Sequence, residues 1–142
     1  MFAGYLVATA NLYSSIRKQI DTYDQNQIKH LVFAGHSQAG AMCAIVYYMY
    51  THDTQRPELK IEKTRAVSYA TPRFVFDGDE DLYSEKCPEL IRVFQILDPV
   101  PYFPLRQSLF TYTHLISGYI HVGQPLCLNG AMASNDINTL VT

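Results

Sequence analysis

The chain has 142 residues, enough for one domain of ordinary size and too few for two. Aliphatic, aromatic and cysteine residues make up 48% of the sequence and charged residues 17%, a balance that argues against intrinsic disorder and predicts a packed core. The formal charge is −2 and the lysines and arginines do not cluster, so nucleic acid is not expected as a partner.

The first segment of the chain has the pattern of an amphipathic helix. Apolar residues recur at steps of three and four over residues 2–20, with polar residues between them. The stretch from Phe2 to Ala10 is apolar, but it lacks the positively charged start of a signal peptide, and the helical pattern continues beyond it. No apolar run approaches the roughly 20 residues that span a bilayer, so the location of the protein in the cell stays open.

The next three elements predict a strand, a helix and a second strand. The short apolar run of residues 31–34 is typical of a buried parallel strand and ends at Gly35. Small and then apolar residues over 38–50 predict a helix that begins where the strand ends. A second strand is predicted over residues 66–70, closed by Pro72, and the spacing fits a right-handed βαβ unit.

The second half of the chain predicts a continuation of the same sheet. Residues 76–88 are acidic and turn-like, residues 91–97 read as a third strand stopped by prolines, and a fourth strand is expected over 126–128. We therefore expect an α/β fold, a small and mostly parallel sheet with flanking helices, in a single domain over residues 1–142. The order of the strands in the sheet is left open.

The sequence GHSQAG at residues 35–40 is the most informative motif. In a nucleophile elbow a serine occupies a strained turn between a strand and a helix, and its neighbours two positions away must be small. Gly35, His36 and Ala39 would form this elbow around Ser37. The alternative is that Ser37 only caps the following helix. A phosphate or dinucleotide loop is less favoured, because neither G-x-G-x-x-G nor the P-loop lysine is present.

A serine needs an imidazole to accept its proton and a carboxylate to orient the imidazole. In α/β-hydrolases these partners follow in the order Ser, Asp or Glu, His. Asp98 fits, because it comes directly after the predicted strand and is followed by Pro99 and Pro101; the alternative is a turn-forming aspartate. Asp53 would lie on the wrong side of the sheet. Surface positions are expected for the other carboxylates, Asp77, Asp79, Glu80 and Asp81.

Chain order also limits the choice of histidine. His30, His36 and His52 come before the nucleophile or directly after its helix, which leaves His114 and His121. We favour His121, because the residues that follow it place it at the junction of a loop and a strand. His114 lies in an aromatic loop and stays the alternative. No metal or other cofactor is expected, since the free thiols predicted for Cys43, Cys87 and Cys127 have neither disulfide nor metal-ligand spacing.

These blocks together resemble the class 3 lipases, a family of fungal-lipase-like α/β-hydrolases. The family typically has G-H-S-L-G-G, a G-S/T-P-R block, a D-x-V-P block and a histidine followed by small or apolar residues. The matching blocks here are GHS at 35–37, YATPR at 69–73, DPVP at 98–101 and HVG at 121–123, within a resemblance that covers roughly residues 3–128. Four ordered blocks are far more specific than one motif.

The resemblance implies a serine hydrolase that cleaves a carboxylic ester, of the acylglycerol or phospholipid type, through an acyl-enzyme. Ser37 would be the nucleophile, Asp98 the acid and His121 the base, and the backbone N–H of Gln38 would supply one oxyanion-hole donor. Gln38 replaces the usual leucine and Ala39 the usual glycine, and neither change removes the backbone donor.

The resemblance also implies parts that the sequence lacks. The family places a second oxyanion donor and a lid well upstream of the elbow, so we expect the chain to represent only part of the family's fold. A catalytically inactive module that serves binding is therefore the alternative function. Lipid is the expected partner, with an acyl groove or a transient lipid contact formed by apolar loop residues, which could equally pack on the sheet: Tyr102, Phe103, Leu105, Leu109, Phe110 and Tyr112. The oligomeric state is unknown.

Overall fold

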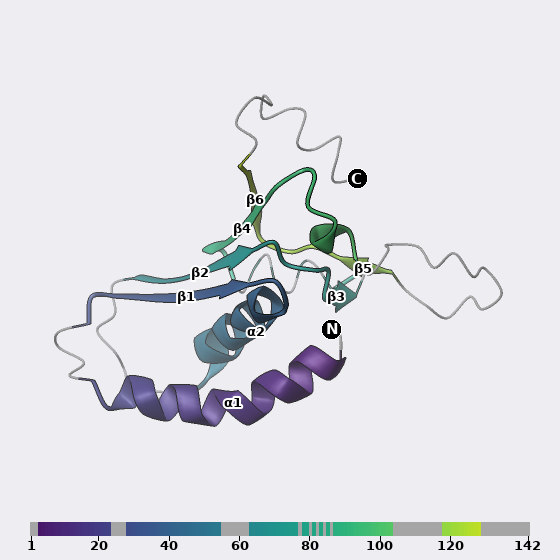
Figure 1. Cartoon of the computed structure of the whole chain (residues 1–142). Coiled ribbons are helices and arrows are strands. Elements are labelled where there is room, and N and C mark those ends of the chain that lie inside the picture. The colour runs from purple at the N-terminus through teal and green to yellow at the C-terminus, as the bar shows by residue number, and fades with distance from the viewer. Residues whose placement is uncertain are drawn as a thin grey trace.

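A computed structural model of the chain describes residues 3–23, 28–54, 63–76, 78–79, 81, 83, 85, 87–103 and 118–128 (Figure 1). Its main element is a four-stranded sheet in the order β1-β2-β4-β6, in which every pair of neighbours is parallel. The strands are β1 (His30–His36), β2 (Lys63–Tyr69), β4 (Leu90–Phe94) and β6 (Gln124–Cys127). This parallel sheet confirms the α/β fold expected from the sequence.

The helix α2 (Gln38–His52) packs directly on one face of this sheet, against β1 and β2. Ala41 and Ala44 of α2 are fully buried, and side chains this small let the helix approach the strands closely. Phe33 of β1 fills the space between, with its ring 5.4 Å from that of Tyr50 and 6.2 Å from that of Tyr47. The centre of the core therefore lies between β1, β2 and α2.

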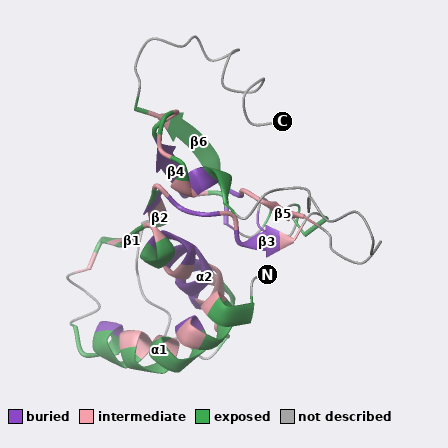
Figure 2. Cartoon of the chain, turned by 45° about the vertical axis from the view of Figure 1, so that its right-hand side comes forward, coloured by how far each residue is buried: buried purple, intermediate pink, exposed green. Residues whose placement is uncertain are grey.

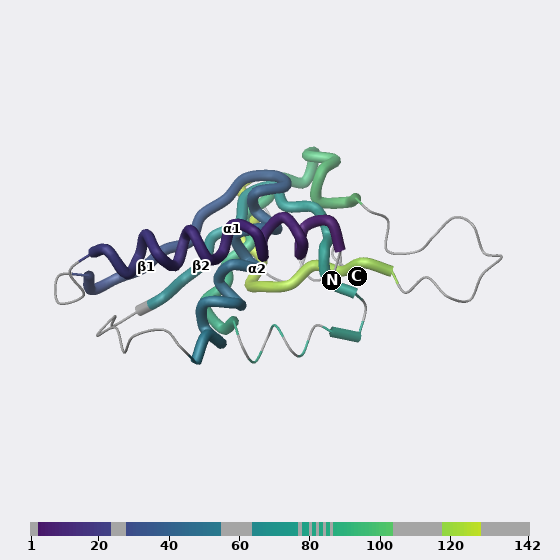
Figure 3. Tube along the Cα trace, turned by 90° about the horizontal axis from the view of Figure 1, so that it is seen from below, coloured from purple at the N-terminus to yellow at the C-terminus, as the bar shows by residue number. Residues whose placement is uncertain are grey.

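The helix α1 (Ala3–Asp21) packs on α2 and forms the outer layer on the same side of the sheet (Figures 1 and 3). A polar contact near its second half ties it to the end of α2. Tyr13 Oη donates to Asp53 Oδ2 over 3.0 Å, and Arg17 Nη1 lies 2.9 Å from the same oxygen. Burial, and then the hydrogen bond with Asp53, raise the pKa of Tyr13. Asp53 thus joins the two helices, in keeping with its exclusion as a catalytic carboxylate.

A second, antiparallel pair of strands was not expected from the sequence. It consists of β3 (Val75–Phe76) and β5 (Tyr119–Ile120), and the rings of Phe76 and Tyr119 stack with centroids 4.8 Å apart. The sequence analysis placed Phe76 in an acidic, turn-like segment and predicted no strand at Tyr119. Strands of two residues are too short to show an alternating pattern, so the pairing depends on tertiary contacts that a local pattern cannot reveal.

The end of β4 corrects another expectation. The third strand was predicted over residues 91–97, but β4 ends at Phe94, and the Asp98 N–H donates to the Gln95 carbonyl over 3.2 Å in a turn. The paired register gives the reason: β2 ends opposite Val93 and β6 ends opposite Phe94. Without a neighbouring strand on either side, residues 95–97 have no ladder to join.

The two faces of the sheet differ in burial (Figure 2). Residues that point toward α2, such as Ala66 and Leu90, are 0% and 1% exposed. On the opposite face, Val32, Tyr69 and Leu126 are 55%, 43% and 52% exposed. Among the described residues, both long helices therefore lie on one side of the sheet.

Candidate active site

Ser37 lies at the sharp turn between β1 and α2, where its backbone has φ 54° and ψ −126°. A positive φ is uncommon for a residue with a side chain and costs on the order of 1–3 kcal/mol, which the surrounding packing must supply. The Ser37 side chain makes no capping hydrogen bond to α2. This arrangement disfavours the alternative in which Ser37 is only a helix cap, because its hydroxyl is not used in that way.

Two glycines around this turn lie where neighbouring atoms leave no room for a side chain. A Cβ added to Gly35 would lie 2.1 Å from the carbonyl oxygen of Ala39, and one added to Gly40 would lie 2.1 Å from Oγ1 of Thr71. Ala39 itself is exposed, which explains why alanine can stand where the family usually has glycine. The crowded positions are therefore 35 and 40, whereas the sequence analysis singled out 35 and 39.

The residue after the nucleophile, Gln38, is the first residue of α2 and is exposed. The first backbone N–H groups of a helix have no acceptor within that helix, and the helix dipole makes this end partly positive. A negatively charged oxygen beside Ser37 would meet both features. The geometry is compatible with the predicted oxyanion donor.

Asp98 lies half-buried just before the single turn η1 (Val100–Tyr102). Its Oδ1 accepts the backbone N–H of Val100 over 3.0 Å, so the carboxylate is oriented by the turn that follows it. The competing carboxylates Asp79 and Asp81 are exposed, as expected, whereas Asp77 and Glu80 lie outside the described residues.

His121 lies between β5 and β6, with its imidazole against the turn η1. Nε2 is 2.6 Å from the carbonyl oxygen of Pro101, and because a carbonyl can only accept, Nε2 must carry the proton. Nδ1 is buried and has no hydrogen-bond partner among the described residues. Burial, and then the nearby Arg92 cation, lower the pKa of His121 to about 3, although the Pro101 contact acts in the opposite direction. The imidazole is therefore neutral at pH 7.

The structure brings Asp98 and His121 to the same turn, through Val100 and Pro101 respectively. Among the described residues, no hydrogen bond joins Ser37, Asp98 and His121 to one another. The alternative base, His114, lies outside the described residues. The roles of Ser37 as nucleophile, Asp98 as acid and His121 as base thus stay predictions.

Arg92 is a feature that the sequence analysis missed. It belongs to β4, it is 3% exposed, and in the part of the chain that the structure describes its Nε has no hydrogen-bond partner. The guanidinium carbon lies 4.7 Å from the centre of the Phe94 ring, a cation–π contact. Burial, and then the Arg73 cation, lower the pKa of Arg92 to about 10. The sequence offered one clue to this buried cation, a single charged residue within an otherwise apolar strand.

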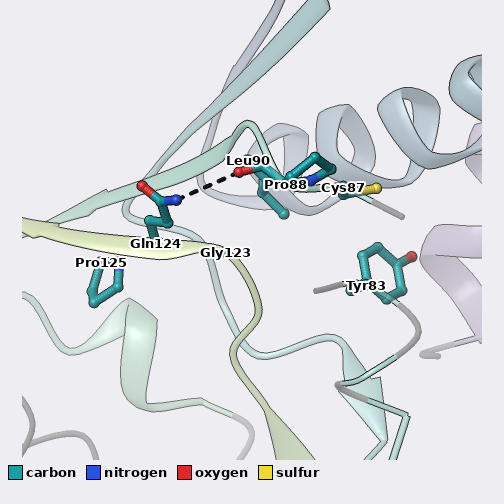
Figure 4. Close-up of a pocket in the computed structure, with 7 residues that line it drawn as sticks. All are labelled: Tyr83, Cys87, Pro88, Leu90, Gly123, Gln124 and Pro125. Carbon is teal, nitrogen blue, oxygen red and sulfur yellow. Dashed lines mark hydrogen bonds between the residues drawn. The ribbon is translucent and has the colours of Figure 1, made fainter. Parts of the chain in front are cut away.

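A pocket of about 410 Å³ opens beside Leu90, at the N-terminal end of β4 (Figure 4). It lies where β4 and β6 begin, and Gln124 Nε2 donates to the Pro88 carbonyl across it over 3.5 Å. The lining residues are Tyr83, Cys87, Pro88, Leu90, Gly123, Gln124 and Pro125. Because Ser37 follows the C-terminal end of β1, this pocket is not part of the predicted site.

Cys43, Cys87 and Cys127 are free, as expected. Burial raises the pKa of both the Cys43 and the Cys87 thiols to about 12, so neither is a reactive thiolate at neutral pH. Within the described ranges, no group of three His, Cys, Asp or Glu residues is arranged to hold a metal ion. In the same part of the chain, no helix has the length and apolar character needed to cross a membrane.

A parallel sheet with a strained serine at a strand-to-helix turn defines the α/β-hydrolase class of proteins. The particular family follows from comparison: residues 1–108 match the family model described as lipase (class 3). The chain therefore belongs to the class 3 lipase family, which confirms the resemblance found in its motifs. No curated protein matches the chain.

Solved structures of three fungal lipases are similar to this chain. The lipase from Rhizopus microsporus var. chinensis has a TM-score of 0.65 and 20% identity, over 92% of this chain and 42% of that one. Lipase II from Rhizopus niveus has a TM-score of 0.64 and 17% identity, over 89% and 44%. The Rhizomucor miehei lipase, in its propeptide complex, has a TM-score of 0.63 and 16% identity, over 87% of this chain and 37% of that one. The likeness shows the fold, and this chain spans about two fifths of their length.

Proposed function

We propose that the chain carries the nucleophile of a serine carboxylic ester hydrolase, which cleaves acylglycerol or phospholipid-type esters through an acyl-enzyme at Ser37. The observation that carries the proposal is the strained Ser37 backbone between β1 and α2, in a chain of the class 3 lipase family. Strained backbone of this kind clusters at active sites, and in a nucleophile elbow it lifts the serine hydroxyl above the sheet.

The proposed reaction begins with attack of Ser37 Oγ on the ester carbonyl carbon. The carbonyl oxygen becomes an oxyanion, which the Gln38 N–H and the positive end of α2 would stabilise. Loss of one such donor costs about 3 kcal/mol of transition-state stabilisation, so a single donor supports only part of the usual rate. Departure of the alcohol leaves an acyl group on Ser37, which water then removes.

His121 and Asp98 are the proposed base and acid. In a triad, the imidazole donates Nδ1–H to the carboxylate and takes the serine proton on Nε2. The described arrangement has the opposite tautomer, with Nε2–H on Pro101. The base would therefore have to leave the Pro101 carbonyl, turn its Nδ1 toward Asp98, and exchange the proton between its two nitrogens. A carboxylate partner would also raise the pKa of His121, because it favours the imidazolium.

The substrate class is supported by apolar side chains beside Asp98. Leu97 and Phe103 are 87% and 56% exposed, and Tyr102 is also exposed. Side chains of this kind, flanking a polar turn, suit contact with an acyl chain or a lipid surface. The other apolar residues predicted for this contact, Leu105, Leu109, Phe110 and Tyr112, lie outside the described residues.

A second function, a catalytically inactive module that binds a partner through the same fold, is favoured by one observation. Within the described ranges the buried Nδ1 of His121 has no partner, and burial and Arg92 lower the pKa of the imidazole so far that it is a poor base. If this arrangement persists with substrate, Ser37 cannot be activated by His121.

A fluorophosphonate probe separates the two functions, because it reacts only with an activated serine. Labelling of the purified chain at Ser37 is expected, and the Ser37→Ala variant should lose it. Ser15→Ala, which changes an exposed serine of α1, is the matched control and should leave labelling unchanged. A folded chain without labelling would support the inactive module.

Turnover of a p-nitrophenyl ester identifies the base. His121→Ala should lower kcat by about 10³-fold or more, while His114→Ala should retain activity. Loss of activity in His114→Ala alone would show that the wrong histidine was chosen.

A further inference from the structure

A short segment after β2 contacts both sides of the predicted site. At its start, the Tyr69 carbonyl oxygen accepts the backbone N–H of Ser37 over 2.8 Å. Two residues further on, Thr71 is 1% exposed and lies so close to Gly40 that no side chain fits there. Residues 69–71 therefore hold the elbow from outside α2.

The same segment then reaches the turn that follows Asp98. The backbone N–H of Arg73 donates to the Phe103 carbonyl over 2.8 Å, and Arg73 Nη1 donates to the Tyr102 carbonyl over 3.2 Å. These carbonyls lie at the C-terminal end of η1, where backbone oxygens find no N–H donor within the turn itself. One residue thus binds both oxygens, and a cation at such an end is electrostatically favourable.

The conformation of η1 determines where the Asp98 carboxylate points. Asp98 Oδ1 accepts the Val100 N–H over 3.0 Å, and the Val100 carbonyl in turn accepts the Phe103 N–H over 3.1 Å. A displaced Phe103 would therefore disturb Val100, and with it the hydrogen bond that orients the carboxylate. At its other end, the segment of residues 69–73 is joined to the nucleophile, because the Tyr69 carbonyl accepts the Ser37 N–H.

We propose that Arg73 is a positioning residue, which fixes the turn η1 and so holds the Asp98 carboxylate in place relative to the nucleophile Ser37. The guanidinium acts through the Tyr102 carbonyl, the backbone N–H of the same residue binds the Phe103 carbonyl, and the side chain acts on the turn and not on the substrate. The effect on reaction rate rests on the function proposed above, whereas the effect on the turn does not.

The test compares Arg73→Met, which keeps the length of the stem and loses the charge and donors, with Arg73→Lys, which keeps a cation and a donor. Arg65→Met is the matched control, because the exposed side chain of Arg65 in β2 pairs with Glu89, which precedes β4, and among the described residues it has no interaction with η1 or the elbow. In each variant of the full chain, hydrogen–deuterium exchange is measured at the amides of Val100, Tyr102 and Phe103. In parallel, ester turnover is measured per site labelled by the fluorophosphonate.

Exchange at the three amides should be about tenfold faster in Arg73→Met and within about threefold of wild type in Arg73→Lys and Arg65→Met. The kcat per labelled site should fall about tenfold in Arg73→Met with KM within about twofold, and Arg73→Lys should restore it. A purely structural role would reduce the number of labelled sites and leave kcat per site unchanged.

Unchanged exchange in Arg73→Met would overturn the proposal. So would a fall in kcat per site that Arg65→Met reproduces. Should Arg73→Met fail to fold, Arg73→Gln is measured in the same way, with the same expected direction. If the wild-type chain is not labelled at all, the function proposed for Ser37 fails, while the exchange data still decide whether Arg73 holds the turn.

Discussion

At Ser37 the chain is confined by backbone packed against backbone, whereas at Asp98 and His121 it is confined by hydrogen bonds to backbone groups of a turn. Gly35 lies against the Ala39 carbonyl with no room for a methyl group. The Asp98 carboxylate and the His121 ring instead depend on the Val100 N–H and the Pro101 carbonyl. The first kind of confinement tolerates no added atom, while the second can be changed by protonation or by loss of a single donor.

The largest expected effect follows from adding one methyl group to the elbow. In Gly35→Ala the new Cβ would lie 2.1 Å from the Ala39 oxygen and 2.9 Å from the Gly40 nitrogen, so the backbone of α2 must move. We expect the free energy of unfolding to fall by about 3 kcal/mol or more, together with loss of fluorophosphonate labelling. Urea unfolding followed by circular dichroism measures the first quantity.

The control for this change is Ala39→Gly, which alters the exposed side of the same turn. It should cost no more than about 1 kcal/mol, the helix propensity difference between alanine and glycine. Equal losses in the two variants would mean that the elbow is not confined by sterics in the way described.

A smaller effect is expected where the crowding is against a side chain. In Gly40→Ala the new Cβ would meet Thr71 Oγ1 at 2.1 Å, whereas the Thr71 Cβ is 3.2 Å away. We expect a loss of about 2 kcal/mol in the free energy of unfolding, because the side chain of Thr71 can yield more readily than backbone can. A double-mutant cycle with Thr71→Ala should recover about 1 kcal/mol of it.

Thr71→Val gives this cycle its control, since valine puts a methyl group where threonine has its hydroxyl. Gly40→Ala should be as costly in that background as in the wild type. Recovery in the valine background as well would show that a polar effect, and not the crowding, makes Gly40→Ala costly.

The same comparison explains how much the sequence could predict. The elbow was predicted because its strand, turn and helix are contiguous and each has a local pattern, from the apolar run at 31–34 to the helix that ends at His52. The end of β4 was predicted wrongly, because it depends on where β2 and β6 end opposite Phe94. The contact of His121 with Pro101 joins residues 20 positions apart, and no local pattern encodes it.

The identities of the candidate site residues were likewise easier to predict than their geometry. Chain order selects Asp98 and His121, but it does not determine which nitrogen of the imidazole is protonated or which group binds it. Burial of Arg92 beside His121 could not be read from an apolar strand that contains one arginine. Local backbone conformation can thus be predicted from neighbouring residues, whereas the electrostatics of the site depend on residues that only the fold brings together.

The smallest of the three effects tests the hydrogen-bonded half of the site through its pH dependence. His121 has a pKa of about 3 in the folded chain, against an ordinary value of 6.5 that the unfolded chain should regain. The unfolded state therefore binds a proton as the pH falls below 6.5, while the folded state does not until about pH 3. The contribution of the neutral ring is complete above pH 6.5 and is lost toward pH 3, at a rate of up to about 1.4 kcal/mol per pH unit.

In His121→Gln this loss should be absent, since the amide does not titrate and its Nε2 can still donate to the Pro101 carbonyl. Between pH 7 and pH 5 the wild type should lose about 1–2 kcal/mol more of its free energy of unfolding than the variant does. The carboxylates are common to both chains and cancel in this difference. Equal losses would mean that the His121 ring already binds a proton in the folded chain within this pH range. Burial would then not hold the ring neutral, and His121 could leave Pro101 for Asp98 as an imidazolium.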